Sequence, residues 1–126
     1  MLSLTSIIVA LSVALSHAAP LDPRQTGTQT YNGDITYYEP GLGSCGETST
    51  DSDAVVALSP SEFSQIPQAC GKSIKITGPD NKTVDAKVVD KCPACASGSI
   101  DVSSTVFQQL APLSDGRIKI SWTFSS

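Results

Sequence analysis

The sequence predicts a small, mainly β domain that closes, or nearly closes, into a disulfide-stapled barrel. Several short segments alternate polar and apolar residues, which is typical of half-buried strands. The chain has 126 residues, 40% of them hydrophobic and 16% charged, which leaves room for one compact domain. About six short strands favour a barrel over a sandwich, because closure removes the edges that a short sheet cannot otherwise protect.

Composition excludes several classes of function. The chain carries 8 basic and 12 acidic residues, a formal net charge of -4, and therefore lacks the basic surplus of proteins that bind nucleic acid. The single histidine, His17, lies in a segment that is predicted below to be a cleaved signal peptide. Without it the mature domain cannot form a Ser-His-Asp triad, a Cys-His pair or a histidine-ligated metal site. We expect no cofactor and no metal.

Residues 1–18 are predicted to be a signal peptide. An apolar run over residues 2–15 is followed by Ser16-His17-Ala18, which places small residues where a signal peptidase cleaves. The run is shorter than the roughly 20 residues that span a bilayer, so we expect a secreted protein and no membrane partner. Residues 19–32, rich in Pro, Gln, Thr and Gly, are expected to form a flexible leader before a domain at 33–126.

Strand signals recur along the domain. The clearest are a hairpin formed by residues 72–77 and 83–89 around a Gly-Pro-Asp-Asn turn, and a final strand at 117–124. Weaker strands are predicted at 34–38 and 54–58. The final strand should turn four apolar side chains inward: Ile118, Ile120, Trp122 and Phe124. Asn81 begins an Asn-Lys-Thr glycosylation sequon at the tip of the hairpin.

Two short helices are also predicted. The first begins at Ser59-Pro60-Ser61-Glu62, where the serine is an N-cap, the proline occupies the first helical position and the glutamate closes a capping box. The second begins near Ser103 or Ser104. Apolar residues then follow at helical spacing, at Val106, Phe107, Leu110 and Ala111.

The four cysteines are an even set in a chain predicted to be secreted, so two disulfides are the default. Of the three connectivities we favour Cys45 with Cys70 and Cys92 with Cys95. The close pair at 92 and 95 is also compatible with a redox motif or with half of a zinc site. A β-type run before it disfavours the redox interpretation, and the absence of a second close pair disfavours zinc.

Five ordered segments resemble the double-psi β-barrel of expansin-like proteins, and more closely the small secreted fungal proteins of the loosenin and rare-lipoprotein-A-like type. They are GDITYY at 33–38, GSCG at 43–46, ACGK at 69–72, VVDKCP at 88–93 and IDVS at 100–103. The tail DGRIKISW at 115–122 fits the same pattern. The resemblance covers residues 33–124 and implies a six-stranded double-psi barrel.

The resemblance implies a polysaccharide groove lined by Thr36, Tyr38 with its neighbour Tyr37, Asp90 and Asp101. Of these, Asp101 is the candidate catalytic residue. Taken alone, Asp101 could be a helix cap, Asp90 a turn former and Thr36 a packing residue. The two tyrosines point to opposite faces of one strand, so at most one should line the groove. A groove-facing Asp101 among apolar neighbours would have a raised pKa.

This chain departs from the family pattern in two ways, which limit how far the family's carbohydrate-binding residues can be assigned to it. Cys92 stands where some two-domain expansins have an aromatic residue, and a bridged cysteine cannot stack on a sugar ring. The flat aromatic platform of the second expansin domain is not expected here. Carbohydrate affinity should therefore come from the groove alone and be weak.

Three functions are compatible with these residues. We prefer a monomeric protein that binds cellulose, chitin or peptidoglycan and loosens the cell wall without hydrolysis. The second is a glycoside hydrolase or lytic transglycosylase with Asp101 as the acid, which would require Glu39 to face the groove as a second carboxylate. The third is a protein-binding module, either a protease inhibitor or an effector that acts on a host protein, with the loop at 41–53 as its surface.

Overall fold

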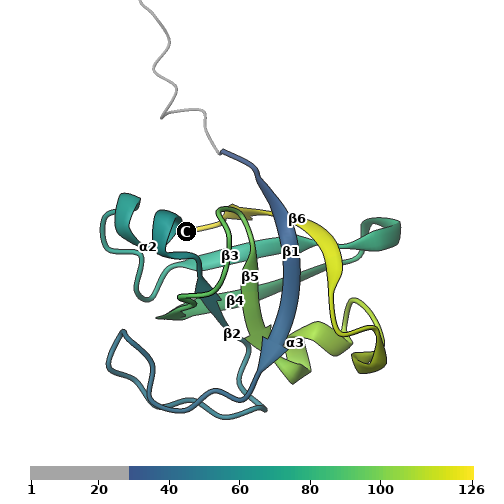
Figure 1. The fold of residues 1–126 in the computed structure, drawn as a ribbon, viewed down its shortest axis with the longest axis horizontal. Coiled ribbons are helices and arrows are strands. Elements are labelled where there is room, and N and C mark those ends of the chain that lie inside the picture. Colours follow the sequence, from purple (N-terminus) through teal and green to yellow (C-terminus); the bar gives the residue numbers. More distant parts are fainter. Residues whose placement is uncertain (1–28) are drawn as a thin grey trace, which may run out of the picture.

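The computed structural model describes residues 29–126 (Figure 1). The predicted signal peptide and the leader up to residue 28 lie outside the described residues. Within residues 29–126, no helix is long and apolar enough to cross a membrane.

The described residues form a closed six-stranded barrel. In chain order the elements are β1 (Tyr31–Tyr38), β2 (Val55–Leu58), α2 (Pro60–Gln65), β3 (Ser73–Thr77), η1 (Pro79–Asn81), β4 (Thr83–Lys91), β5 (Ile100–Ser103), α3 (Ser104–Gln108), η2 (Leu113–Asp115) and β6 (Ile118–Phe124). Around the barrel the strands follow the order β1-β5-β2-β4-β3-β6. The pairs β1–β5 and β2–β4 are parallel, and the other four pairs are antiparallel. The predicted fold class is confirmed.

The barrel interior is filled by the inward side chains of all six strands and by α3, which Figure 1 shows at the end of β5. Trp122 and Phe107 are the largest fully buried side chains. The predicted inward face of β6 is confirmed: Ile120 and Trp122 are buried, and Ile118 and Phe124 pack partly buried against the core. The indole Nε1 of Trp122 donates to the carbonyl of Gly98 at 3.0 Å, which satisfies the buried N–H.

Two strands are longer than the sequence predicted. β1 begins at Tyr31, three residues early, because Tyr31 pairs with Trp122 across β6 and stacks on its ring with centroids 4.3 Å apart. β4 continues to Lys91, two residues late, because its parallel pairing with β2 extends to the Leu58–Lys91 pair. Asp90 is therefore held inside a strand.

The predicted hairpin is present, with β3 and β4 antiparallel around the turn at η1. Asp80 and Asn81 both have positive φ, 60° and 59°, a conformation that Asn and Asp tolerate better than other non-glycine residues. Asn81 is exposed there. Glycosylation of its sequon stays a prediction.

The first predicted helix is α2, with Ser59 as its N-cap and Pro60 in its first turn. Glu62 forms part of the expected capping box: its N–H donates to Ser59 Oγ at 3.4 Å, but its carboxylate takes further partners. It is 3% exposed, and its carboxylate accepts hydrogen bonds from Ser59 Oγ at 2.5 Å, from Ser97 Oγ at 2.7 Å and from the Gly98 N–H at 2.8 Å. The last two donors lie in the loop before β5, so this glutamate ties α2 to that loop.

The second predicted helix is α3. Ser103 precedes it as the N-cap residue, but its hydroxyl donates to the Asp53 carbonyl at 2.6 Å and not to the helix. Val106, Phe107 and Leu110 are buried and Ala111 is partly buried. The predicted apolar face of this segment is confirmed.

The structure contains both favoured disulfides. Cys45–Cys70 joins the loop between β1 and β2 to the segment before β3, and Cys92–Cys95 closes the turn after β4. No free cysteine remains among the described residues.

Candidate functional site

Strand pairing lines up four residues on adjacent strands. Thr36 of β1 pairs with Asp101 of β5, Asp101 pairs with Ala57 of β2, and Ala57 pairs with Asp90 of β4. Paired residues on neighbouring strands turn their side chains to the same face of a sheet. The two aspartates thus flank one small side chain and are two strand spacings apart, roughly 10 Å along the sheet.

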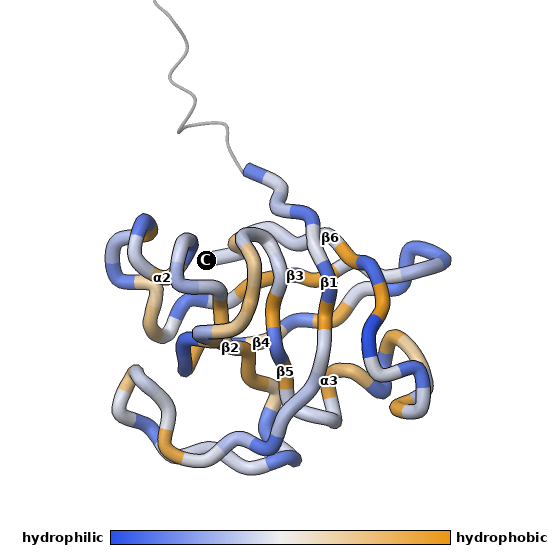
Figure 2. Tube along the Cα trace, in the orientation of Figure 1, coloured by the Kyte–Doolittle hydropathy of each residue, from blue (hydrophilic) through white to orange (hydrophobic). Residues whose placement is uncertain are grey.

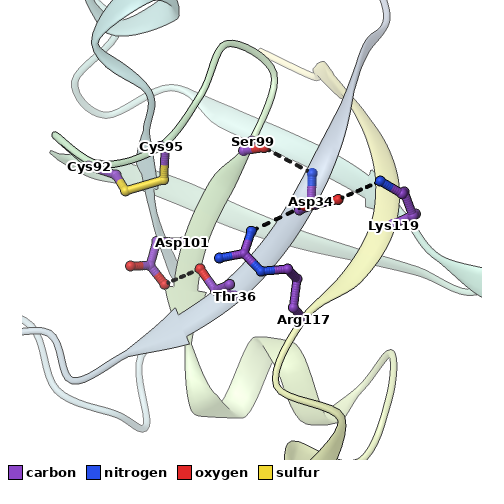
Figure 3. A network of polar contacts seen from close by, with 8 residues as sticks. All are labelled: Asp34, Thr36, Cys92, Cys95, Ser99, Asp101, Arg117 and Lys119. Carbon is purple, nitrogen blue, oxygen red and sulfur yellow. Dashed lines mark hydrogen bonds and ion pairs between the residues drawn. A yellow bond between two sulfur atoms is a disulfide. The ribbon is translucent and has the colours of Figure 1, made fainter.

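A cleft opens beside this row, between β1 and the segment at 92–96, with β5 beneath (Figure 3). Thr36 and Asp101 line it, and Arg117 closes one end. The Cys92–Cys95 disulfide forms part of the opposite wall. The lining side chains include no aromatic ring.

Asp101 has one hydrogen-bond donor, Thr36 Oγ1, which lies 3.0 Å from Asp101 Oδ1 (Figure 3). Its side chain is half-buried. Burial raises the pKa of Asp101 above its ordinary value, as expected, and the charge of Asp90 adds to this effect. The Thr36 hydrogen bond and the positive charge of Arg117 act in the opposite direction but do not outweigh burial. Asp101 Oδ2 faces the cleft without a protein donor among the described residues.

Both carboxylate oxygens of Asp90, by contrast, accept hydrogen bonds from the protein. Its Oδ1 accepts from the Ser44 N–H at 2.8 Å, from Ser44 Oγ at 3.0 Å and from the Lys91 N–H at 2.8 Å. Its Oδ2 accepts from the Tyr38 hydroxyl at 3.3 Å. Burial, together with the nearby negative charge of Asp90, raises the pKa of Tyr38 well above its ordinary value, so the phenol remains a donor. Asp90 thus fastens the loop at Ser44 to β4.

The side chains of Tyr37 and Tyr38 point to opposite faces of β1, as predicted. Tyr38 lies on the face of β1 that carries Thr36 and reaches Asp90. Tyr37 lies on the other face, where its ring packs edge-on against Phe107 with centroids 4.9 Å apart and its hydroxyl donates to the Leu113 carbonyl at 3.0 Å. Tyr37 is therefore not brought together with the other predicted groove residues. The roles assigned to all five remain predictions.

The sequence analysis missed a charged cluster at the end of the cleft. Asp34 accepts from Arg117 at 3.1 Å and from Lys119 at 3.1 Å (Figure 3). These hydrogen bonds, from Lys119 first and Arg117 second, lower the pKa of Asp34. The alternation of β1 contained a usable signal, because Asp34 precedes Thr36 by two residues and must share its face. Nothing in the sequence indicated that Arg117 would adjoin that face.

Within residues 29–126, no three His, Cys, Asp or Glu side chains gather where they could hold a metal ion.

Comparison with known proteins identifies relatives of the whole barrel. No protein-family model matches the chain. The papain inhibitor of Streptomyces mobaraensis is 31% identical over 127 residues, which cover 95% of this chain and 84% of that protein. The solved structure of a Streptomyces papain inhibitor superposes with a TM-score of 0.68 at 32% identity and covers 78% of this chain and 96% of that one.

A mutant of the Clavibacter michiganensis expansin, solved in complex with cellohexaose, also superposes with a TM-score of 0.68, at 31% identity. The match covers 78% of this chain but only 51% of the expansin. The structural matches cover 78% of this chain and agree with its barrel fold. The chain belongs to the expansin-like, barwin-like family of double-psi β-barrels.

Proposed function

We propose that the chain binds a cell-wall polysaccharide in the cleft beside Asp101 and loosens its packing without cleaving it. The observation that carries the proposal is a half-buried carboxylate with one donor in a cleft lined by both polar and apolar side chains. Sugar hydroxyls donate strong hydrogen bonds to such a carboxylate, and each bond compensates for the water that Asp101 loses. The expansin solved with cellohexaose supports a glucan chain as ligand.

Hydrolysis is disfavoured by the state of the other carboxylates. Glycosidases need a second carboxylate that can act as nucleophile or activate a water molecule. Asp90 accepts four hydrogen bonds from the protein, and Asp34 is held by two cations. Glu39 is exposed and is not among the residues that line the cleft. This leaves Asp101 as the one cleft carboxylate with a free acceptor.

The affinity should be weak, because no aromatic ring in the cleft lining offers a stacking surface for a sugar. The predicted signal peptide and the two disulfides support action outside the cell.

The test is a pull-down on insoluble cellulose, chitin and peptidoglycan, with Asp101→Asn beside wild type and Asp85→Asn as the matched control. Asp85 is an exposed aspartate of β4 outside the cleft. We expect wild type and the control to bind at least one polymer, Asp101→Asn to bind markedly less, and no reducing sugar to appear. Equal binding by all three would contradict the site, and release of reducing sugar would contradict the non-hydrolytic mechanism.

Inhibition of a papain-like protease is the second candidate function. The chain matches 84% of one papain inhibitor and 96% of the solved inhibitor chain, but only half of the expansin. An assay of papain activity with and without the protein tests it. Full papain activity at excess protein would remove this candidate.

A further inference from the structure

The loop between β1 and β2 contains a small hairpin at residues 41–49, which we call the stapled hairpin. Figure 1 shows this loop projecting from the barrel at the lower left. Leu42 and Thr48 form an antiparallel bridge. Three backbone hydrogen bonds complete it: Ser49 N–H to Gly41 O at 3.0 Å, Gly43 N–H to Glu47 O at 3.1 Å and Gly46 N–H to Gly43 O at 2.9 Å. The loop is thus ordered by its own backbone.

The stapled hairpin is also fastened to the barrel. The Cys45–Cys70 disulfide holds its turn, and the Cys45 N–H donates to the Val89 carbonyl of β4 at 3.1 Å. Gly43 lies so close to β4 that a Cβ there would be 2.3 Å from the Val89 carbonyl oxygen. Ser44 adds its two hydrogen bonds to Asp90. The turn of the hairpin therefore has little freedom to lose on binding.

This rigid element presents an apolar side chain to solvent. Leu42 is 75% exposed, and among the described residues the only other exposed large apolar side chain is Tyr37, at 37%. Figure 2 shows the loop as mainly hydrophilic with one apolar segment. The neighbouring Gly41 is open, since a Cβ added to it would meet nothing within 4 Å. Leu42 is outside the residues that line the cleft, so the proposed polysaccharide site does not account for it.

We propose that the stapled hairpin is the inhibitory element of this chain and inserts Leu42 into an apolar side-chain pocket in the substrate cleft of a papain-like cysteine protease. The inference rests on the second candidate function above. A leucine on a pre-ordered loop favours binding, because its burial in the pocket gains apolar area and the loop loses little entropy. Gly41 leaves room beside the anchor for the backbone of the protease.

The experiment measures inhibition of papain by wild type, Leu42→Asp and Gly41→Ala, with Lys75→Ala as the control. Lys75 is exposed on β3, outside the hairpin and the cleft. We expect Leu42→Asp to raise the inhibition constant at least about thirtyfold, as for a central interface residue. Gly41→Ala should raise it by a smaller factor without lowering the melting temperature, because its methyl group meets only the protease. Lys75→Ala should match wild type.

Polysaccharide binding by the same variants separates the two surfaces. Leu42→Asp should still bind the polymer that wild type binds, which also shows that the variant is folded. Unchanged papain inhibition by Leu42→Asp, with wild type inhibiting, would overturn this inference and leave the second candidate function standing. A wild type that does not inhibit papain would overturn both. Loss of polymer binding with retained inhibition would assign the hairpin to the polysaccharide site and overturn the inference.

Discussion

Two carboxylates next to the segment at 92–99, Glu62 and Asp101, differ in the direction of their pKa shifts. Glu62 is 3% exposed, yet three hydrogen bonds, from Ser59, Ser97 and Gly98, outweigh the effect of burial and lower its pKa. Asp101 is less buried, yet its single hydrogen bond from Thr36 does not outweigh burial, and its pKa is raised.

The comparison shows that hydrogen-bond donors can offset burial: several donors lower the pKa of Glu62, whereas the single donor to Asp101 leaves its pKa raised. Glu62 has its donors built into the fold and serves as an anchor. Asp101 lacks them, and under the proposed function the hydroxyl groups of a bound polysaccharide supply them. The different roles that we assign to Glu62 and Asp101 thus follow from the different numbers of hydrogen-bond donors that the fold supplies to each.

Of the changes at these two carboxylates, the largest expected effect comes from removing the Glu62 anchor. Glu62→Ala leaves a buried N–H of Gly98 and two hydroxyls without their acceptor, so we expect a loss of about 3 kcal/mol in the free energy of unfolding. Urea denaturation measures it. Glu47→Ala is the matched control, because that glutamate is half-exposed in an ion pair with Lys87 and should change stability by less than about 0.5 kcal/mol. Equal losses of unfolding free energy in the two variants would contradict the role of Glu62 as an anchor.

A smaller loss is expected from removing the Cys92–Cys95 disulfide in the wall of the Asp101 cleft. Cys92→Ser with Cys95→Ser removes a disulfide that closes a ring with a sequence separation of 3, and the chain-entropy relation gives about 2 kcal/mol. The Cys45–Cys70 bridge, with a separation of 25, should contribute more, about 3.5 kcal/mol. Polymer binding should weaken in the first variant, because the wall of the cleft loosens. Full binding with the wall disulfide removed would contradict its part in the cleft.

Asp101→Asn should move binding and stability in different directions. The amide keeps the acceptor for Thr36 but loses the charge that sugar hydroxyls bind, so we expect about tenfold weaker polymer binding. Thermal unfolding at neutral pH should show equal or slightly higher stability, since the buried charge is removed. A clear drop in melting temperature would mean that Asp101 is a structural residue like Glu62.

The pH dependence of stability should have opposite signs at the two sites. Because the folded-state pKa of Glu62 is lowered, its contribution is present above the unfolded pKa of 4.5 and is lost as pH falls through the folded value. The folded-state pKa of Asp101 is raised above 3.8, so its contribution is present below that pH and is lost as pH rises through the folded value. Urea titrations from pH 3 to 7 should show the stability difference between wild type and Glu62→Gln shrinking in acid. The advantage of Asp101→Asn should shrink there as well.

The smallest effect is expected at Glu39, which is exposed beside Pro40. Glu39→Gln should leave polymer binding, stability and reducing-sugar release as in wild type. A wild type that releases sugar and a Glu39→Gln variant that does not would revive the glycosidase interpretation and make Glu39 the second carboxylate.

The sequence alone determined the features that depend on near neighbours. Alternation located the β3–β4 hairpin and the inward face of β6, and the Ser59-Pro60 pair located α2. Strand geometry also required Tyr37 and Tyr38 to face apart, as they do. These features follow from backbone preferences over a few residues, which the local sequence carries.

Tertiary structure decided which polar groups are satisfied and which are free. Glu62 has the spacing of a capping box, but two of its partners, Ser97 and Gly98, lie 35 and 36 residues away, and Thr36 meets Asp101 across 65 residues. Asp90 and Asp101 look alike in sequence, yet the loop at Ser44 occupies one and leaves the other open to the cleft. Local patterns fix which face a side chain takes, whereas barrel closure decides which distant donor lies opposite it, and that donor determines its charge and its role.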